Sequence, residues 1–158
     1  MYHAIVKRRI RALFEAISRG DAEPVLDAFA AGGEHIFIGD DHALAGRRNN
    51  QASIRAWYDR LRQLTPDIRF ELHRIDVAGT PWNTIASVEW TETNTATDGI
   101  PAQNKGVHVV HLRWGKMTRL LILTDTATLI DTLQRNADSS DGLSLAAPID
   151  DRPGWPAP

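Results

Sequence analysis

The chain has 158 residues, a length typical of one domain with a buried core. Charged residues make up 24% and the formal net charge is −2, so the composition gives no sign of a nucleic-acid-binding surface. Without cysteine the chain can form neither a disulfide nor a thiol-based site. The apolar runs are too short for a membrane span, and the opening MYHAIVKRRI lacks a signal-peptide core. We therefore expect a cytoplasmic protein with no nucleic-acid or membrane partner.

The first half of the chain carries three segments in which apolar residues recur at helical spacing. The predicted helices cover residues 3–19, the stretch from Asp21 to Phe29, and residues 50–64. Gly32 and Gly33 break the second helix, and a short strand at 34–38 and a loop at 39–46 follow. This half should therefore supply three helices around one short strand.

The second half alternates between apolar and polar residues and predicts four strands. They cover residues 68–78, residues 82–95 and the two runs within 106–125, and Asp125 then caps a last short helix. Helices gathered on one side of a curled antiparallel sheet form a cone-shaped α+β domain. We expect residues 1–135 to form this single domain and residues 136–158 to form a Pro-rich extended tail.

The stretch GVHVVHLRWGKMTRLLILTD, residues 106–125, predicts a hairpin. A two-residue Trp114-Gly115 turn would place a bulky residue at positive φ, so we favour a three-residue loop, Arg113-Trp114-Gly115, with a glycine bulge. That loop puts His108 on the apolar inner face. A Gly115-Lys116 turn would place His111 there instead.

The order and spacing of these segments resemble the nuclear transport factor 2-like fold. The resemblance rests on Arg19-Gly20-Asp21, Phe29, Ile54-Arg55-Ala56-Trp57-Tyr58 and the hairpin, and it covers about residues 3–134. Within that superfamily the chain is similar to the ketosteroid isomerase-like and polyketide-cyclase (SnoaL-like) branch. The resemblance implies a conical pocket between the sheet and the helices, and a homodimer built on the sheet.

The catalytic residues of the known relatives are not intact in this sequence. In a gapless register with limonene epoxide hydrolase, the catalytic Arg and its paired Asp fall on Glu89 and Thr91. Ile122 occupies the position of that enzyme's second Asp and of the acid/base Asp of the polyketide cyclases. The general base of ketosteroid isomerase falls on Phe37, or on Asp40 if the loop is shifted. The resemblance therefore predicts a pocket without giving its chemistry.

Four ionisable residues are candidates for catalysis: His35, Glu89, His108 and Asp40. His35 on the first strand could act as a base or hydrogen-bond donor, or simply bond a backbone carbonyl. Glu89 lies in an otherwise apolar or small run, and the gapless register would point it into the cone beside His108. In the alternative, Glu89 faces solvent and Trp90 fills the core. Asp40 lies in the loop at the mouth of the pocket.

We predict a cofactor-independent isomerase, cyclase or dehydratase that acts on a small, mostly apolar carbonyl or polycyclic compound. The expected substrate-binding residues are Phe37, Trp57, Tyr58, Thr91, Val110, Leu120 and Ile122. No short metal-binding motif is present, so neither a metal nor a cofactor is expected. The alternatives are a non-catalytic ligand-binding or assembly module of the same fold, and an epoxide hydrolase with a different catalytic set. The expected partners are a small apolar molecule and a second copy of the chain.

Overall fold

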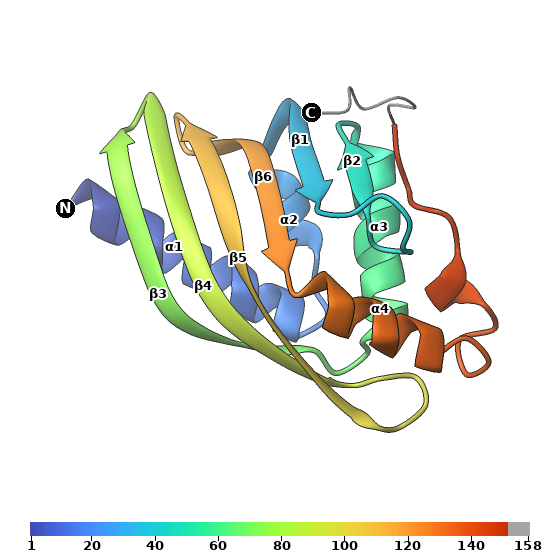
Figure 1. Cartoon of the computed structure of the whole chain (residues 1–158). Coiled ribbons are helices and arrows are strands. Elements are labelled where there is room, and N and C mark those ends of the chain that lie inside the picture. Colours follow the sequence, from blue (N-terminus) through green and yellow to red (C-terminus); the bar gives the residue numbers. More distant parts are fainter. Residues whose placement is uncertain (152–158) are drawn as a thin grey trace.

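The computed structural model describes residues 1–151 and shows a curled, unclosed sheet covered on one side by helices (Figure 1). The helices are α1 (Tyr2–Ser18), α2 (Glu23–Ala28), α3 (Gln51–Leu64), α4 (Thr126–Arg135) and the short 3-10 helix η1 (Leu143–Leu145). The strands are β1 (Phe29–Phe37), β2 (Gly46–Arg48), β3 (Arg69–Thr80), β4 (Asn83–Thr95), β5 (Pro101–Arg113) and β6 (Lys116–Thr124). The predicted α+β cone is confirmed.

The sheet has the order β2-β1-β6-β5-β4-β3 and is mixed rather than wholly antiparallel. β1 runs parallel to β6, with Phe37 opposite Ile122. β2, which we did not predict, begins at the last residue of the expected loop and pairs with β1. β1 also begins earlier than predicted, at Phe29, and the irregular pairing before Glu34 contains Gly32 at a φ of 69°. The two glycines therefore bend this strand instead of preceding it.

The turn of the β5–β6 hairpin differs from the prediction. It is a two-residue turn in which Trp114 has a φ of 52° and Gly115 a φ of 76°. The cost of a positive φ at Trp114 is offset by two contacts with the neighbouring β3–β4 turn. The Trp114 amide donates to the Pro81 carbonyl at 2.7 Å, and its ring centroid lies 6.0 Å from that of Trp82.

A bulge further along the hairpin restores the predicted inner face. Leu112 pairs with Met117 and His111 with Arg119, so Thr118 is the extra residue of β6. His108 consequently lies opposite Ile122 and faces the helices. The predicted position of His108 therefore holds although the predicted turn was wrong.

Arg48 is fully buried where β2 meets the tail. Its guanidinium group donates to the carbonyl oxygens of Ala45, Gly46 and Ile149 at 2.6 to 2.9 Å, and lies 5.4 Å from the ring centroid of Trp57. Burial lowers the pKa of Arg48 to about 10, so this side chain stays charged at neutral pH. Backbone carbonyls thus satisfy the buried cation.

The tail folds back onto the domain. Residues 137–145 form turns and η1, so the expected extended course starts only at Ala146. Beyond it, the carboxylate of Asp151 accepts hydrogen bonds from the amides of Asn49 and Asn50 and from the Ser53 hydroxyl at the start of α3. The remaining part of the predicted tail, residues 152–158, lies outside the described range.

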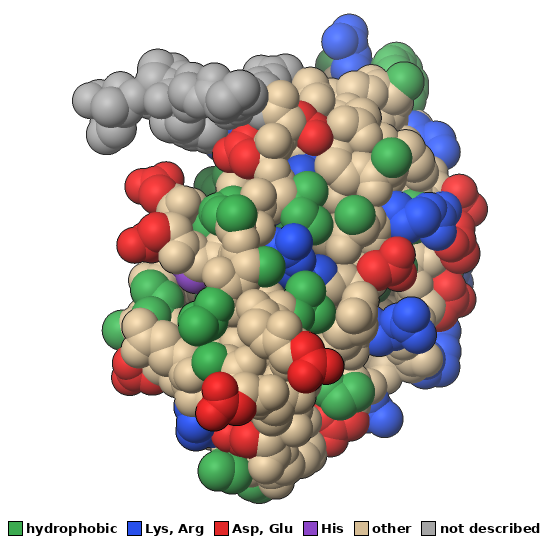
Figure 2. Space-filling model, turned by 90° about the vertical axis from the view of Figure 1, so that its right-hand side faces the viewer, with side chains coloured by type: hydrophobic (Ala, Val, Ile, Leu, Met, Phe, Trp, Pro, Cys, Tyr) green, Lys and Arg blue, Asp and Glu red, His purple; other side chains and the backbone are tan. Residues whose placement is uncertain are grey.

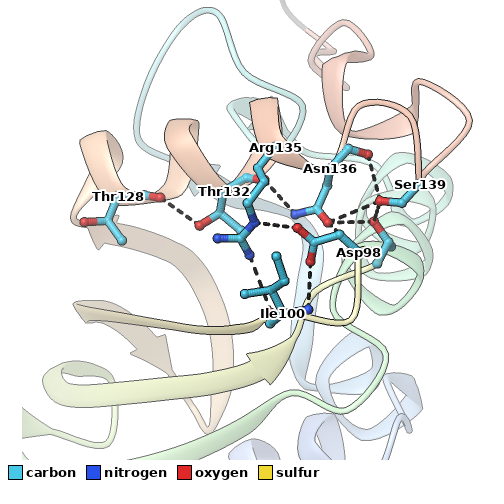
Figure 3. A network of polar contacts seen from close by, with 8 residues as sticks. Asp98, Ile100, Thr128, Thr132, Arg135, Asn136 and Ser139 are labelled. Carbon is cyan, nitrogen blue, oxygen red and sulfur yellow. Dashed lines mark hydrogen bonds and ion pairs between the residues drawn. The ribbon is translucent and has the colours of Figure 1, made fainter.

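A polar network holds the end of α4 against the loop between β4 and β5 (Figure 3). The buried Asn136 accepts from the Thr97 hydroxyl and the Asp98 amide through Oδ1, and donates to the Thr132 carbonyl through Nδ2. Arg135 forms an ion pair with Asp98. Asp125 caps the other end of α4 by accepting from the Thr128 amide, as predicted. The helix is thus fixed at both ends over one end of the cone.

The two faces of the molecule differ in where their apolar side chains lie. On the face that carries α3, α4 and the tail, hydrophobic side chains are scattered among charged ones (Figure 2). The convex face of the sheet instead carries neighbouring apolar residues on β5 and β6: Val107, Val109, Leu121 and Leu123. None of the helices within residues 1–151 combines the length and hydropathy needed to cross a membrane.

We expect the convex face of the sheet to be covered by a second copy of the chain, because it leaves Leu123 and its neighbours in contact with water. Light scattering should give twice the 17.6 kDa of one chain. The variant Leu123→Arg should be monomeric, whereas Gln63→Arg, which adds the same charge on α3, should leave the mass unchanged. A wild-type mass of one chain at micromolar concentration would contradict this expectation.

The variant Asp151→Ala should reduce the free energy of unfolding at pH 7 by about 1 kcal/mol, since it removes charge-assisted bonds that are partly screened by solvent. Burial opposes ionisation of Asp151, but the bonds from Ser53, Asn49 and Asn50 outweigh it and lower its pKa. The pKa of an Asp side chain in the unfolded chain is about 4. The loss of free energy of unfolding should therefore be complete above this pH, and it should shrink as the pH falls through the lower pKa of Asp151 in the folded protein.

Urea titrations of wild type and variant at pH 7 and pH 3 measure this difference. Asp138→Asn is the control, because this exposed carboxylate makes no side-chain hydrogen bond or ion pair within residues 1–151. Equal losses at both pH values would show that the Asp151 charge has no part in holding the tail.

Candidate active site

An apolar cavity of about 180 Å³ lies between the concave face of the sheet and helices α1, α2 and α3. It reaches the surface beside Ile5 and Arg9 of α1, which are exposed although they belong to its wall. Six of the seven predicted substrate-binding residues lie on this wall: Phe37, Trp57, Tyr58, Val110, Leu120 and Ile122. The seventh, Thr91, lies on the convex face and contacts His73 at 2.7 Å. That the six bind a ligand stays a prediction.

His108 lies on the cavity wall, where β5 faces α1. Its Nδ1 accepts a hydrogen bond of 2.7 Å from Nε1–H of Trp90, and its ring centroid lies 4.9 Å from that of Phe14. Burial lowers the pKa of His108 to about 3. The imidazole is therefore neutral at every pH near neutrality.

Glu92 is the carboxylate of the cavity wall, and the sequence analysis missed it. Burial raises its pKa and the negative charge of Asp67 adds to the effect, whereas a 3.0 Å hydrogen bond from Asn94 Nδ2 opposes it. The alternation of β4 alone could be read for either face, but once Val88 and Trp90 lie on the inner face, Glu92 continues that face. A carboxylate in such surroundings is a stronger base than one in water.

Glu89 does not enter the cavity, so the predicted Glu89–His108 pair does not form. In the β4–β5 pairing Val88 lies opposite His108, which turns Glu89 to the convex face beside Val107. There its side chain is exposed. The gapless register with limonene epoxide hydrolase placed this position on the wrong face, and the alternative with Trp90 in the core is the one observed.

His35 is fully buried but is not part of the cavity wall. Its ring packs against Trp57 and Tyr58, with centroid distances of 4.4 and 5.4 Å, and its Nδ1 accepts from Arg48 Nε at 3.3 Å. Burial, followed by the positive charge of Arg48 and the neighbouring His108, lowers its pKa well below the usual range. His35 thus supports the wall from behind.

The loop after β1 does not bring Asp40 to the cavity either. Asp40 is exposed and absent from the wall, whereas Ala43, Leu44 and Ala45 of the same loop are buried. The Leu44 carbonyl accepts a 2.8 Å bond from Nε1–H of Trp57, which ties the loop beneath α3. The predicted mouth loop is therefore partly a core segment.

Tyr58 adds a hydroxyl group to the wall. This group makes no hydrogen bond to any residue in the range 1–151, and burial raises its pKa. Asn104 also lines the cavity, but its side chain already bonds the Asp125 carbonyl and the Lys105 amide. Tyr58, Glu92 and His108 are therefore the wall residues with polar capacity left that we consider for a ligand inside the cavity, whereas Arg9 lies at its opening. No group of three histidine or acidic side chains suited to a metal ion occurs among residues 1–151.

Comparison with solved structures finds the same fold in proteins of low sequence identity. An NTF2-like protein of unknown function from Burkholderia pseudomallei has a TM-score of 0.70 and 22% identity, over 80% of this chain and 95% of that one. AclR, a putative hydroxylase from Streptomyces galilaeus, has a TM-score of 0.67 and 15% identity, over 84% of this chain and 82% of AclR. A putative SnoaL-like polyketide cyclase from Jannaschia sp. has a TM-score of 0.62 and 13% identity, over 79% of this chain and 88% of the cyclase.

At the level of sequence, no curated protein matches this chain. The family model of the SnoaL-like domain matches residues 10–120. This segment runs from α1 to β6 and contains Tyr58, Glu92 and His108. The chain belongs to the SnoaL-like family, and it has the fold of the NTF2-like proteins.

Proposed function

We propose that this protein is a cofactor-independent enzyme of the isomerase or cyclase type that moves protons on a small, mostly apolar carbonyl compound. The observation that carries the proposal is the presence of Glu92 and His108 on the wall of one apolar cavity, both with shifted pKa values. Titratable groups whose environments push their pKa values away from those in water are typical of acid–base sites. The family membership supports the same class of chemistry.

In the proposed reaction the Glu92 carboxylate removes a proton from the carbon next to the carbonyl group. The electron pair of that C–H bond moves into the enolate, whose oxygen lies against His108. In an isomerisation, protonated Glu92 returns the proton to another carbon of the conjugated system. In a cyclisation, the enolate carbon attacks a second carbonyl of the same molecule, and the proton from Glu92 neutralises the new alkoxide.

The cavity limits the size of the enclosed part of the substrate. A dry cavity of about 150 Å³ in another protein holds benzene, so about 180 Å³ encloses one or two rings. A larger polycyclic compound would extend through the opening near Ile5 and Arg9. The positions of limonene epoxide hydrolase that fall on Glu89 and Thr91 lie on the convex face, so an epoxide hydrolase would need a different catalytic set inside the cavity.

The bicyclic ketone 2-tetralone in D₂O tests the proposal, because exchange of its α-hydrogens reports proton removal without a complete reaction. Wild type should accelerate the exchange measured by NMR, and Glu92→Gln should lower the rate on the order of 10²-fold. Glu89→Gln is the matched control on the same strand and should retain the wild-type rate. Binding of 2-tetralone without exchange above the buffer rate would instead support a non-catalytic binding module.

The same substitution should show that the Glu92 carboxylate lowers the free energy of unfolding. Because its folded pKa is raised, this cost to stability is absent below the unfolded pKa of about 4.3 and grows as the pH rises through the folded value. Glu92→Gln should therefore unfold at higher urea concentration than wild type at pH 7, and at about the same concentration at pH 4. A less stable variant at pH 7 would mean that the carboxylate serves the fold.

A further inference from the structure

We propose that Trp90 is a positioning residue that holds His108 in the tautomer protonated on Nε2, so that His108 presents a hydrogen-bond donor to the ligand. The inference rests on the proposed function for its catalytic meaning, but the geometry that carries it is independent of any substrate. It assigns a direction to the hydrogen bond between His108 and the ligand. It also determines whether Glu92 or His108 can act as the base.

Trp90 reaches His108 because glycine stands opposite it in the sheet. In the β4–β5 pairing Trp90 lies opposite Gly106, and His108 is the next residue of β5 on the same face. A Cβ atom at position 106 would lie 2.5 Å from the indole ring of Trp90 and 2.2 Å from the Leu123 carbonyl oxygen. The indole therefore lies over Gly106, which brings its Nε1 to 2.7 Å from His108 Nδ1.

The hydrogen bond from Trp90 fixes where the proton of His108 resides. An indole N–H can only donate, so Nδ1 of His108 must be the acceptor and carries no proton. A neutral imidazole has one N–H group, which is then on Nε2. Nε2 makes no hydrogen bond within residues 1–151 and is not among the fully buried polar atoms, so it is open to the cavity.

This arrangement restricts both the ligand and the mechanism. The only lone pair of neutral His108 is occupied by Trp90, so His108 cannot accept a proton from a ligand without breaking that bond. The ligand atom beside Nε2 must be an acceptor, such as a carbonyl or enolate oxygen. Glu92 is then the one wall residue among those described that can serve as the base at neutral pH.

Long-range ¹H–¹⁵N NMR on wild-type protein without ligand tests the proposal at pH 7. We expect the Nδ1 shift of His108 in the range of an unprotonated nitrogen and the Nε2 shift in that of a protonated one. Trp90→Phe removes the donor and keeps an aromatic ring. It should give averaged shifts from two tautomers and a higher pKa for His108, because the neutral form loses its hydrogen bond.

Trp57→Phe is the matched control. Trp57 lines the same cavity and also donates through Nε1, but to the Leu44 carbonyl, so this variant should leave the His108 spectrum unchanged. Gly106→Ala should also give a tautomer mixture, because its Cβ atom would displace the indole and the β6 backbone at Leu123 while the Trp90 N–H group is kept. A wild-type His108 protonated on Nδ1, or on both nitrogens, would overturn the proposal even if neither variant folds.

The outcome is separable from that of the proposed function. If the tautomer is as expected but 2-tetralone undergoes no exchange, the acid–base activity is wrong and the Trp90–His108 geometry stands. If exchange occurs and Trp90→Phe leaves both the His108 shifts and the rate unchanged, the positioning role of Trp90 is wrong and the activity stands. If both hold, Trp90→Phe should lower the exchange rate.

Discussion

The cavity depends on a constraint of solvation: an apolar enclosure cannot hydrate the polar groups on its wall. Each such group must form a hydrogen bond within the protein, become neutral, or stay unpaired until a ligand binds to it. Asn104 follows the first course and His108 the second, since burial lowers the pKa of His108 to about 3. Burial raises the pKa of Glu92, and the hydrogen bond from Asn94 partly opposes that shift. The Tyr58 hydroxyl follows the third. The same desolvation that is unfavourable for the fold therefore creates the reactivity attributed to the site.

The edge of the sheet where β1 pairs with β2 shows a different solution to the same problem. Arg48 stays charged although it is fully buried, because three carbonyl groups surround it and the Trp57 ring covers its face. This arrangement also holds His35 through Nδ1. Behind Trp57 and Tyr58 of the cavity wall thus lie two buried polar residues that do not line the cavity. Arg48 and His35 therefore serve the stability of the fold, whereas the reactivity that we propose belongs to the polar residues on the cavity side of Trp57 and Tyr58.

Periodicity in the sequence was sufficient for the helices, the meander and the inner face of β5, because these features depend on local spacing. It failed where a tertiary contact outweighed a local preference. Trp114 adopts a positive φ because Pro81 and Trp82 of a neighbouring turn hold it there, and no local pattern contains that contact. The face of β4 was ambiguous because both faces carry polar residues, and only the pairing with β5 shows that Glu92 and not Glu89 is enclosed. The parallel pairing of β1 with β6 joins segments far apart in the chain and likewise left no local signal.

The attachment of the tail to Arg48 sets an order of events for a chain made from its N-terminus. Arg48 and its partner Ile149 are 101 residues apart, and Asn49 and Asp151 are 102 apart. At usual rates of synthesis such a separation takes roughly 5 to 20 s, whereas helices and hairpins form in microseconds. The meander and its helices can therefore assemble while the guanidinium group of Arg48 still lacks one of its acceptors. The last step in the maturation of the cavity is then the docking of a segment that contributes no residue to the wall itself.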